Sequence, residues 1–140
     1  MAIKLVYNPF TNNFDYASES GGGGGGGPGG VTMWVDVTGN TQAMAVNTGY
    51  TANAMSLVVF TLPDICIYGS VFRVAGKGVG GWKIGLNAGQ VIHFGNVDTT
   101  IGTAGFLSST NQYDAIELLC TVANTEFTVI SGPQGDLTVN

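Results

Sequence analysis

The stretch that decides the fold is residues 115–130, AIELLCTVANTEFTVI. Apolar side chains occupy every second position from 116 to 122, and further on Phe127 and Val129 alternate with Glu126 and Thr128. A period of two is typical of β-strands that bury one face. Between the two halves, residues 123–125 (Ala-Asn-Thr) have the composition of a hairpin loop. The stretch therefore predicts two strands, 116–122 and 126–130.

Short runs of the same kind recur through the rest of the chain. The run 56–62 (SLVVFTL) is nearly continuous in apolar residues and is followed by Pro63, which predicts a strand covered on both sides. No segment shows a sustained helical period with caps. Many short strands joined by Gly-rich turns predict an all-β fold, an antiparallel sandwich or jelly-roll-like barrel. The remaining predicted strands are 33–37, 65–68, 71–75, 82–86, 91–94 and 137–139.

The composition of the chain predicts self-association. Only 9% of the 140 residues are charged, against about 25% in an ordinary soluble domain, whereas 44% are hydrophobic. So few charges cannot cover the surface of a domain of this size, and such a surface is poorly protected against association. We therefore expect an oligomer, or a subunit built into a larger assembly.

The same composition argues against several function classes. The net charge of −5 and the four basic residues argue against nucleic acid as a partner, because phosphate binding needs Lys and Arg in number. The longest apolar runs are far too short for a membrane span. With one His and two Cys, few zinc sites and few routes to acid–base catalysis remain. We therefore expect no metal, no cofactor and no membrane partner.

Three parts are visible along the chain: an arm (1–20), a glycine tract (21–30, GGGGGGGPGG) and a β-sandwich domain (31–140). The arm is rich in apolar and aromatic residues but too short to fold alone. We expect it to be extended and to dock on another protein by adding a strand to a sheet edge. Its anchoring residues are predicted to be Leu5, Tyr7, Phe10, Phe14 and Tyr16.

The glycine tract has two interpretations. It is a flexible tether between arm and domain, because Gly has the largest backbone entropy to lose on ordering. Alternatively, three chains pack their tracts side by side in the extended polyproline-II conformation, which only glycine lets approach closely. That oligomer stem consists of Gly21, Gly22, Gly23, Gly24, Gly25, Gly26, Gly27 and Pro28.

Residues that bear chemistry are few and poorly arranged. Gly76, Gly78 and Gly81 match G-x-G-x-x-G, but the dinucleotide motif needs a following helix, and residues 82–84 (Trp-Lys-Ile) have the pattern of a strand. A wide turn between two strands is therefore the better interpretation.

A nucleophilic triad of Cys120, His93 and Asp114 has little support. Cys120 and Cys66 both lie among apolar neighbours and are better interpreted as small buried hydrophobes than as reactive thiols. Whether the two cysteines form a disulfide stays open. No pair of carboxylates stands out by spacing, so we predict no catalytic residue.

Two further sets have open interpretations. Three of the four cations, Arg73, Lys77 and Lys83, fall within eleven positions, and either meet an acidic surface on a neighbouring subunit or are scattered in solvent. Exposed aromatics could stack on sugars. The candidates are Trp82, Tyr50, Tyr68 and Tyr113, although Trp82 alternates with Ile84 and Leu86 and is better placed in the core.

Longer phrases of the sequence carry a resemblance. The opening KLVYNPFTNNFDY (4–16) before a glycine run is similar to segments of tail-fibre and other virion-surface proteins of tailed bacteriophages and prophages. The strings VFRVAGKGVGGWKIGLNAGQVIHFG (71–95) and SSTNQYDAIELLCTVANTEFTVIS (108–131), with the closing GDLTV (135–139), resemble a small β domain of such proteins. The resemblance implies a homotrimeric, β-rich structural part of a phage particle, and it transfers no functional residue.

Residues and resemblance together predict a non-enzymatic virion protein. We expect a homotrimeric surface subunit, either capsid decoration or short fibre, on the outer surface of the particle. Its partners are predicted to be its own copies and another virion protein, such as the major capsid or tail protein. Two alternatives remain open: a carbohydrate-binding module that recognises a host glycan, and a self-assembling extracellular filament subunit.

Overall fold

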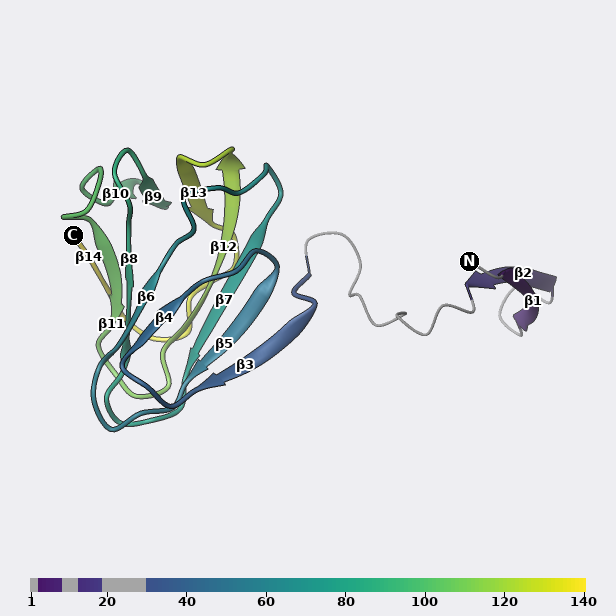
Figure 1. Ribbon diagram of the computed structural model, residues 1–140, viewed down its shortest axis with the longest axis horizontal. Helices are drawn as coiled ribbons and strands as arrows, with labels where there is room; N and C mark the ends of the chain where they lie inside the picture. Colours follow the sequence, from purple (N-terminus) through teal and green to yellow (C-terminus); the bar gives the residue numbers. More distant parts are fainter. Residues whose placement is uncertain (1–2, 9–12, 19–29) are drawn as a thin grey trace.

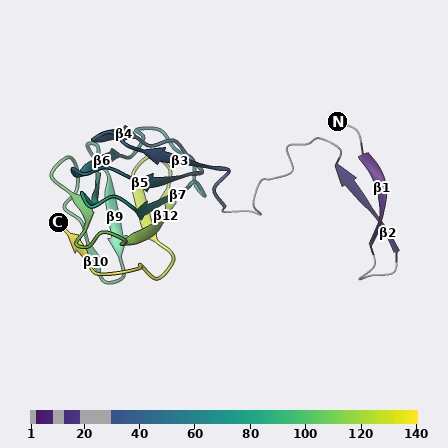
Figure 2. The same ribbon diagram turned by 90° about the horizontal axis from the view of Figure 1, so that it is seen from below.

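The computed structural model describes residues 3–8, 13–18 and 30–140, and within them the chain is all-β (Figure 1). The domain consists of two sheets that pack face to face, seen from a second direction in Figure 2. The prediction of an all-β fold is confirmed.

The larger sheet has seven strands in the order β10-β9-β13-β12-β7-β5-β3. Its strands are β3 (Met33–Val37), β5 (Thr48–Ala52), β7 (Val71–Gly76), β9 (Val91–Phe94), β10 (Val97–Asp98), β12 (Ala115–Val122) and β13 (Glu126–Val129). The smaller sheet has five strands in the order β14-β11-β8-β6-β4. These are β4 (Thr41–Ala43), β6 (Val58–Thr61), β8 (Trp82–Gly85), β11 (Phe106–Ser109) and β14 (Leu137–Val139).

From β3 to β8 the chain alternates between the two sheets, and this produces parallel neighbours. β3, β5 and β7 pair in parallel in the larger sheet, while β4, β6 and β8 pair in parallel in the smaller one. Each strand of one sheet thus serves as the crossover that a parallel pair needs in the other. The predicted antiparallel arrangement is therefore wrong for this half of the domain, because each connection carries the chain across to the opposite sheet instead of reversing it within one sheet.

Antiparallel pairing follows in the second half of the domain. β12 pairs with β7 on one side and forms a hairpin with β13 on the other, as residues 115–130 predict. Among the described strands, neither sheet closes on itself, so the domain is a sandwich of mixed sheets and not a barrel. The finer jelly-roll description stays a prediction.

The core lies between the sheets and is built from the inward positions of both. The Tyr50 ring of the larger sheet packs 5.3 Å from the Phe60 ring of the smaller one, measured between centroids. Trp82 is fully buried, and its indole Nε1 donates a hydrogen bond of 2.7 Å to the backbone oxygen of Asp114. This bond satisfies the polar edge of a large apolar side chain, which is how buried Trp is generally accommodated.

Two predicted strands are wrong in detail. The run 56–62 shortens to β6, and it is covered on one face only, because Val58 and Phe60 are buried while Thr61 is exposed. Residues 65–68 form no strand, since the side chain of Asn124 accepts the backbone N–H of Cys66 and holds the segment as a loop. The sequence analysis also missed β4, β5, β10 and β11.

The described part of the arm is a hairpin. β1 (Ile3–Asn8) and β2 (Asn13–Ser18) pair antiparallel, with Leu5 opposite Tyr16 and Tyr7 opposite Phe14 in the register. The two halves of the predicted extended arm thus pair with each other. Phe10 and the predicted stem, Gly21 to Gly27 and Pro28, lie outside the described residues.

Candidate functional site

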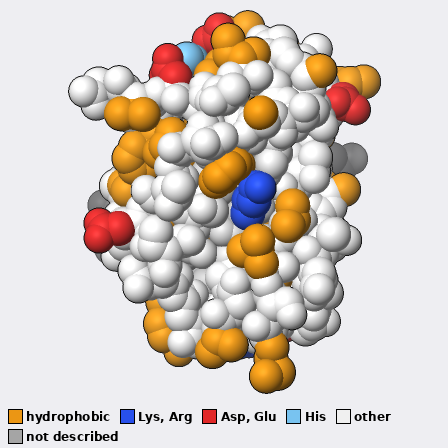
Figure 3. Space-filling view, turned by 90° about the vertical axis from the view of Figure 1, so that its left-hand side faces the viewer, with side chains coloured by type: hydrophobic (Ala, Val, Ile, Leu, Met, Phe, Trp, Pro, Cys, Tyr) orange, Lys and Arg blue, Asp and Glu red, His pale blue; other side chains and the backbone are white. Residues whose placement is uncertain are grey.

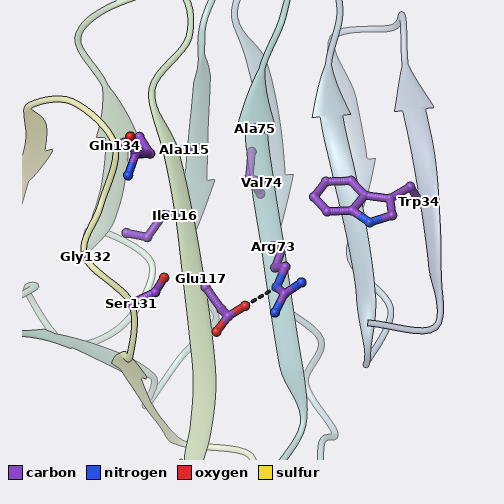
Figure 4. A pocket seen from close by; sticks show the side chains of 10 residues that line it. All are labelled: Trp34, Arg73, Val74, Ala75, Ala115, Ile116, Glu117, Ser131, Gly132 and Gln134. Carbon is purple, nitrogen blue, oxygen red and sulfur yellow. Dashed lines mark hydrogen bonds and ion pairs between the residues drawn. The ribbon is translucent and has the colours of Figure 1, made fainter. Parts of the chain in front are cut away.

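A groove of about 280 Å³ crosses the outer face of the seven-stranded sheet (Figure 4). This is the face opposite to Phe72 and Val74, which point into the core. The polar and aromatic side chains that line the groove come from three strands and from the segment after β13. They are Trp34, Arg73, Glu117, Ser131 and Gln134.

The groove is organised by one row of residues that runs across four adjacent strands. Trp34 of β3 is paired with Gly49 of β5, Gly49 with Arg73 of β7, and Arg73 with Glu117 of β12. Residues in register on neighbouring strands share a face of the sheet and interact directly. The row therefore places an indole ring, a gap without a side chain and a charged pair side by side.

Gly49 allows the Trp34 ring to lie against the sheet. A Cβ atom at position 49 would lie 2.6–2.7 Å from three carbons of the indole ring, closer than real Cβ contacts. The ring therefore covers the place where a side chain of β5 would stand. Trp34 is nevertheless 51% exposed, so part of its apolar surface remains available to a ligand.

Arg73 and Glu117 form an ion pair through the Arg73 Nε atom, drawn as a dashed line in Figure 4. The pair is partly exposed, and such pairs contribute only about 0.2–1 kcal/mol to stability. The guanidinium carries four more N–H donors, and the carboxylate has further acceptor sites. The pair thus supplies both donors and acceptors to a ligand in the groove.

The far side of the groove is the segment 131–134. It is fixed to the start of β12 by two backbone hydrogen bonds of 3.0 Å between Ala115 and Gln134, one in each direction. Ser131 and Gln134 add hydroxyl and amide groups to the lining. The whole site is therefore assembled on a sheet and on a segment tied to it.

The three residues considered for a nucleophilic triad, Cys120, His93 and Asp114, do not contact one another in the structure. His93 Nδ1 is 2.7 Å from Asp98 Oδ1 and its Nε2 is 3.2 Å from Glu126 Oε2. The hydrogen bond to Asp98 is the largest cause that raises the pKa of His93 above its ordinary value. Asp114 instead accepts the backbone N–H groups of Thr110 and Asn111 at its carboxylate.

The two cysteines are buried, as predicted, and they lie together. Their Sγ atoms are 3.1 Å apart. Burial is the largest cause that raises the pKa of Cys120, to about 12, so its thiol is protonated near neutral pH. The expectation that both residues are buried and apolar in character is confirmed.

The G-x-G-x-x-G segment is a wide turn between β7 and β8, as predicted, and no helix follows it. The backbone N–H groups of Lys77 and Gly78 both donate to the carbonyl oxygen of Ala52, at 3.0 and 2.8 Å. These donors are thus taken up by the last residue of β5 and are not directed at a phosphate. The glycines are needed for close contact between two loops.

The three cations of the domain have separate partners within the chain. Arg73 pairs with Glu117, Lys77 Nζ lies 3.8 Å from Asp36 Oδ1, and Lys83 Nζ lies 4.1 Å from the centre of the Phe106 ring. The pKa of Asp36 is lowered, mainly by the hydrogen bond from Thr51. The cations thus form no common basic patch.

The predicted sugar-stacking aromatics divide into two groups. Trp82 and Tyr50 are buried in the core, so Tyr50 is wrong as an exposed candidate, whereas Tyr68 and Tyr113 are exposed. The sequence analysis missed Trp34. The only signal for it was its position in the strand 33–37, where it alternates with Met33 and Val35 and so faces away from them.

Exposed apolar side chains gather at the two ends of the sandwich. At one end, Ile65, Ile67 and Tyr68 belong to the loop between β6 and β7. At the other end, Met55, Val79 and Tyr113 lie on three loops that contact one another through Gly78 and Gln112. Figure 3 shows that apolar side chains are also spread over the side of the molecule near β14 and β11.

Comparisons with known proteins place the chain in no family. No protein-family model matches the chain, and a search of curated proteins returns no match. Within residues 3–8, 13–18 and 30–140, no three His, Cys, Asp or Glu side chains are grouped to hold a metal ion. In the same described part of the chain, no helix has the length and apolar character needed to cross a membrane.

Proposed function

We propose that this chain is a non-enzymatic structural protein of a phage virion, a homotrimeric subunit of capsid decoration or short fibre on the outer surface of the particle. The proposal rests on the resemblance of its sequence to virion-surface proteins and on the surface of the domain. The described residues offer apolar contacts where an ordinary soluble domain carries charge.

The observation that carries the proposal is the exposure of large apolar side chains at both ends of the sandwich. Met55 is 89% exposed and Ile65 is 79% exposed, and each lies in a loop with further exposed apolar residues. Exposed large apolar side chains that gather in one place are typical of protein–protein contact sites. Copies of the chain that cover these loops would bury surface that a lone chain leaves in water.

The edge of the larger sheet supports the same conclusion. β3 is the last strand in the order of that sheet, and Met33 and Trp34 on it are about half exposed. An edge strand with apolar side chains is a template for pairing with another chain. In this proposal the arm, residues 1–20, contacts the major capsid or tail protein, and three arms on one trimer bind more tightly than one arm alone.

Light scattering and deletion of the arm test the proposal. The full chain should have about three times the subunit mass of 14.4 kDa, and a chain without residues 1–20 should stay oligomeric but lose attachment to particles. A monomeric full chain, or attachment that survives the deletion, contradicts the proposal.

Variants of the two ends identify the contact surface. One double variant replaces Ile65 and Ile67 by Ser, and a second replaces Met55 and Val79 by Ser, so that each changes one end of the sandwich. At least one of the two should weaken the oligomer, while the melting temperature of the dissociated chain hardly changes. Thr61→Ala, an exposed substitution on a strand, serves as the control and should leave the oligomer intact. If all variants stay trimeric, neither end is the contact surface.

A second candidate function, carbohydrate recognition, is favoured by the groove at Trp34. The apolar face of a pyranose ring stacks on an exposed indole, and its hydroxyl groups can exchange hydrogen bonds with Arg73 and Glu117. Binding on a glycan array should be at least about five-fold weaker for Trp34→Ala, since loss of one aromatic contact costs about 1 kcal/mol or more. Tyr113→Ala, another exposed aromatic outside the groove, is the matched control and should bind normally.

A further inference from the structure

Residues 63–69, in the loop between β6 and β7, bury only one side chain in the domain. Of residues 63–69 only Cys66 is buried, whereas Ile65, Ile67 and Tyr68 on either side of it are exposed. Cys66 therefore holds a segment that presents three large apolar side chains to solvent.

The backbone around Cys66 is fixed by β12 and by the loop that joins β12 to β13. The Cys66 N–H donates to the side-chain oxygen of Asn124 at 2.8 Å, and the Asn124 N–H donates back to the Cys66 carbonyl at 3.0 Å. At the other end of the loop, the Gly69 N–H donates to the Cys120 carbonyl at 2.9 Å. These bonds place Cys66 directly over Cys120 of β12.

The two sulfur atoms are close enough to react with little movement. Their separation of 3.1 Å is about 1 Å longer than the ~2.05 Å of a sulfur–sulfur bond. Both side chains are buried, and the sequence has no third cysteine that could compete for either of them. The two cysteines of the chain are therefore arranged as one pair.

We propose that Cys66 and Cys120 are the site of an intramolecular disulfide that ties the 63–69 loop to β12. The oxidant is a low-molecular-weight disulfide, RSSR. One protein thiolate attacks it, releases RS⁻ and forms a mixed disulfide, and the second thiolate then attacks the protein sulfur and releases the second RS⁻. The two cysteine sulfurs lose two electrons, the RSSR bond is reduced by them, and the two cysteine protons end on two RSH molecules.

The disulfide has a consequence for the surface of the domain. Without it the loop with Ile65, Ile67 and Tyr68 depends on hydrogen bonds and on one small buried side chain. With it the loop is cross-linked to the eight-residue strand β12, which pairs on both sides within the larger sheet. Oxidation thus fixes one of the two apolar ends in the conformation that the structure shows.

The oxidation rate in the folded state should depend on pH. Exchange proceeds through the thiolate, and burial keeps Cys120 in the thiol form near neutral pH. The disulfide should therefore form slowly in the folded protein near neutral pH and faster in mildly alkaline solution. It should form readily when the chain refolds in the presence of the oxidant, before the sulfurs are buried.

Thiol counting on the full chain tests the proposal. The reduced protein is incubated with oxidised glutathione, either folded in mildly alkaline solution or during refolding, then denatured and treated with iodoacetamide. Intact mass should show no alkylated thiol in the oxidised sample and two in the reduced one. Peptide mapping should join the peptides that contain Cys66 and Cys120.

Thermal unfolding and proteolysis of the same two samples give a second measurement. The oxidised chain should melt about 10 °C higher, because the link closes a long loop of the unfolded chain. Cleavage by chymotrypsin after Tyr68 should be slower in the oxidised chain. Cys66→Ala and Cys120→Ala, each treated with the oxidant, should show neither effect.

The outcomes are decisive without the variants, because the oxidised and reduced forms of the unaltered chain are compared directly. Two thiols that remain open to alkylation after both treatments overturn the proposal. Links between chains instead of within one chain overturn it as well. The number of alkylated thiols and the position of the link can be measured in a monomer and in a trimer alike. The test is therefore independent of the proposed virion function.

Discussion

The substitution Gly78→Ala tests whether the G-x-G-x-x-G turn exists for close packing between loops. In the structure, Gly78 lies against the backbone of the loop between β5 and β6. A Cβ atom at position 78 would lie 2.3 Å from the carbonyl oxygen of Ala54 and 2.4 Å from its nitrogen. Ordinary contact begins at 3.4 Å, so the two loops would have to separate by about 1 Å. Because both partners are backbone, no change of rotamer can relieve the contact.

The expected cost follows from three contributions. Overpacking of a close contact costs about 1–3 kcal/mol. The separation also lengthens the hydrogen bonds that Gly78 donates to Ala52, at the end of β5, and that Gly80 donates to Ala54, at 2.8 and 3.0 Å, and each is worth about 1 kcal/mol. The lower entropy of alanine in the unfolded chain returns about 0.4–1 kcal/mol. Gly78→Ala should therefore lower the free energy of unfolding by about 2–4 kcal/mol.

Urea unfolding and thermal melting measure this effect, with Gly39→Ala as the matched control. A Cβ atom at position 39 has no atom within 4 Å, so the same substitution there should change stability by less than about 0.5 kcal/mol. Gly78→Ala should melt about 10 °C below the unaltered chain. Equal stability of the two variants would refute the packing argument.

Three further predictions concern the larger sheet and its connections. The unaltered chain should be more stable than His93→Gln by less than about 1 kcal/mol, because protonated His93 is stabilised in the folded state. This difference should be complete below the unfolded pKa of His, about 6.5, and should vanish as the pH rises through the raised pKa of the folded state. Urea unfolding at several pH values measures it. Asp114→Ala should cost about 2–4 kcal/mol, because two backbone N–H groups lose their charged acceptor at 2.8 Å, and unfolding curves that overlay those of the unaltered chain would contradict this. Gly49→Ala should displace the Trp34 ring, seen as a shift in tryptophan fluorescence with a melting temperature that falls only slightly; an unchanged spectrum would show that the ring does not rest on this glycine.

The strands could be predicted where side chains alternate, but their pairing could not. Residues 115–130 specify two strands and the loop between them, and the structure has β12 and β13 there. A turn such as residues 76–81 looks the same in the sequence whether the chain reverses within a sheet or crosses to the opposite one. The residues of a turn indicate how freely its backbone can bend, but not the direction in which the chain leaves it. The parallel pairing among the strands from β3 to β8 therefore could not be predicted from the local sequence.

The groove could not be predicted from the sequence, for a related reason. Trp34 and Arg73 are far apart in the chain and meet across β5, whose sequence TGYTA carries a glycine at its second position and gives a weak strand signal. That glycine is what lets the indole lie flat on the sheet. The residue that weakened the prediction of the strand is thus the one that creates the site.

The charges of the domain lead to the final step of the argument. Each cation with a described side chain has a partner within the chain: Arg73 pairs with Glu117, Lys77 lies near Asp36, and Lys83 covers the Phe106 ring. His93 likewise lies between two carboxylates. The basic groups are therefore engaged before any other molecule arrives, and a partner gains little from them by long-range attraction. The exposed apolar loops and the edge of β3 are what the domain still offers, so association in the proposed virion must come chiefly from apolar burial and strand pairing.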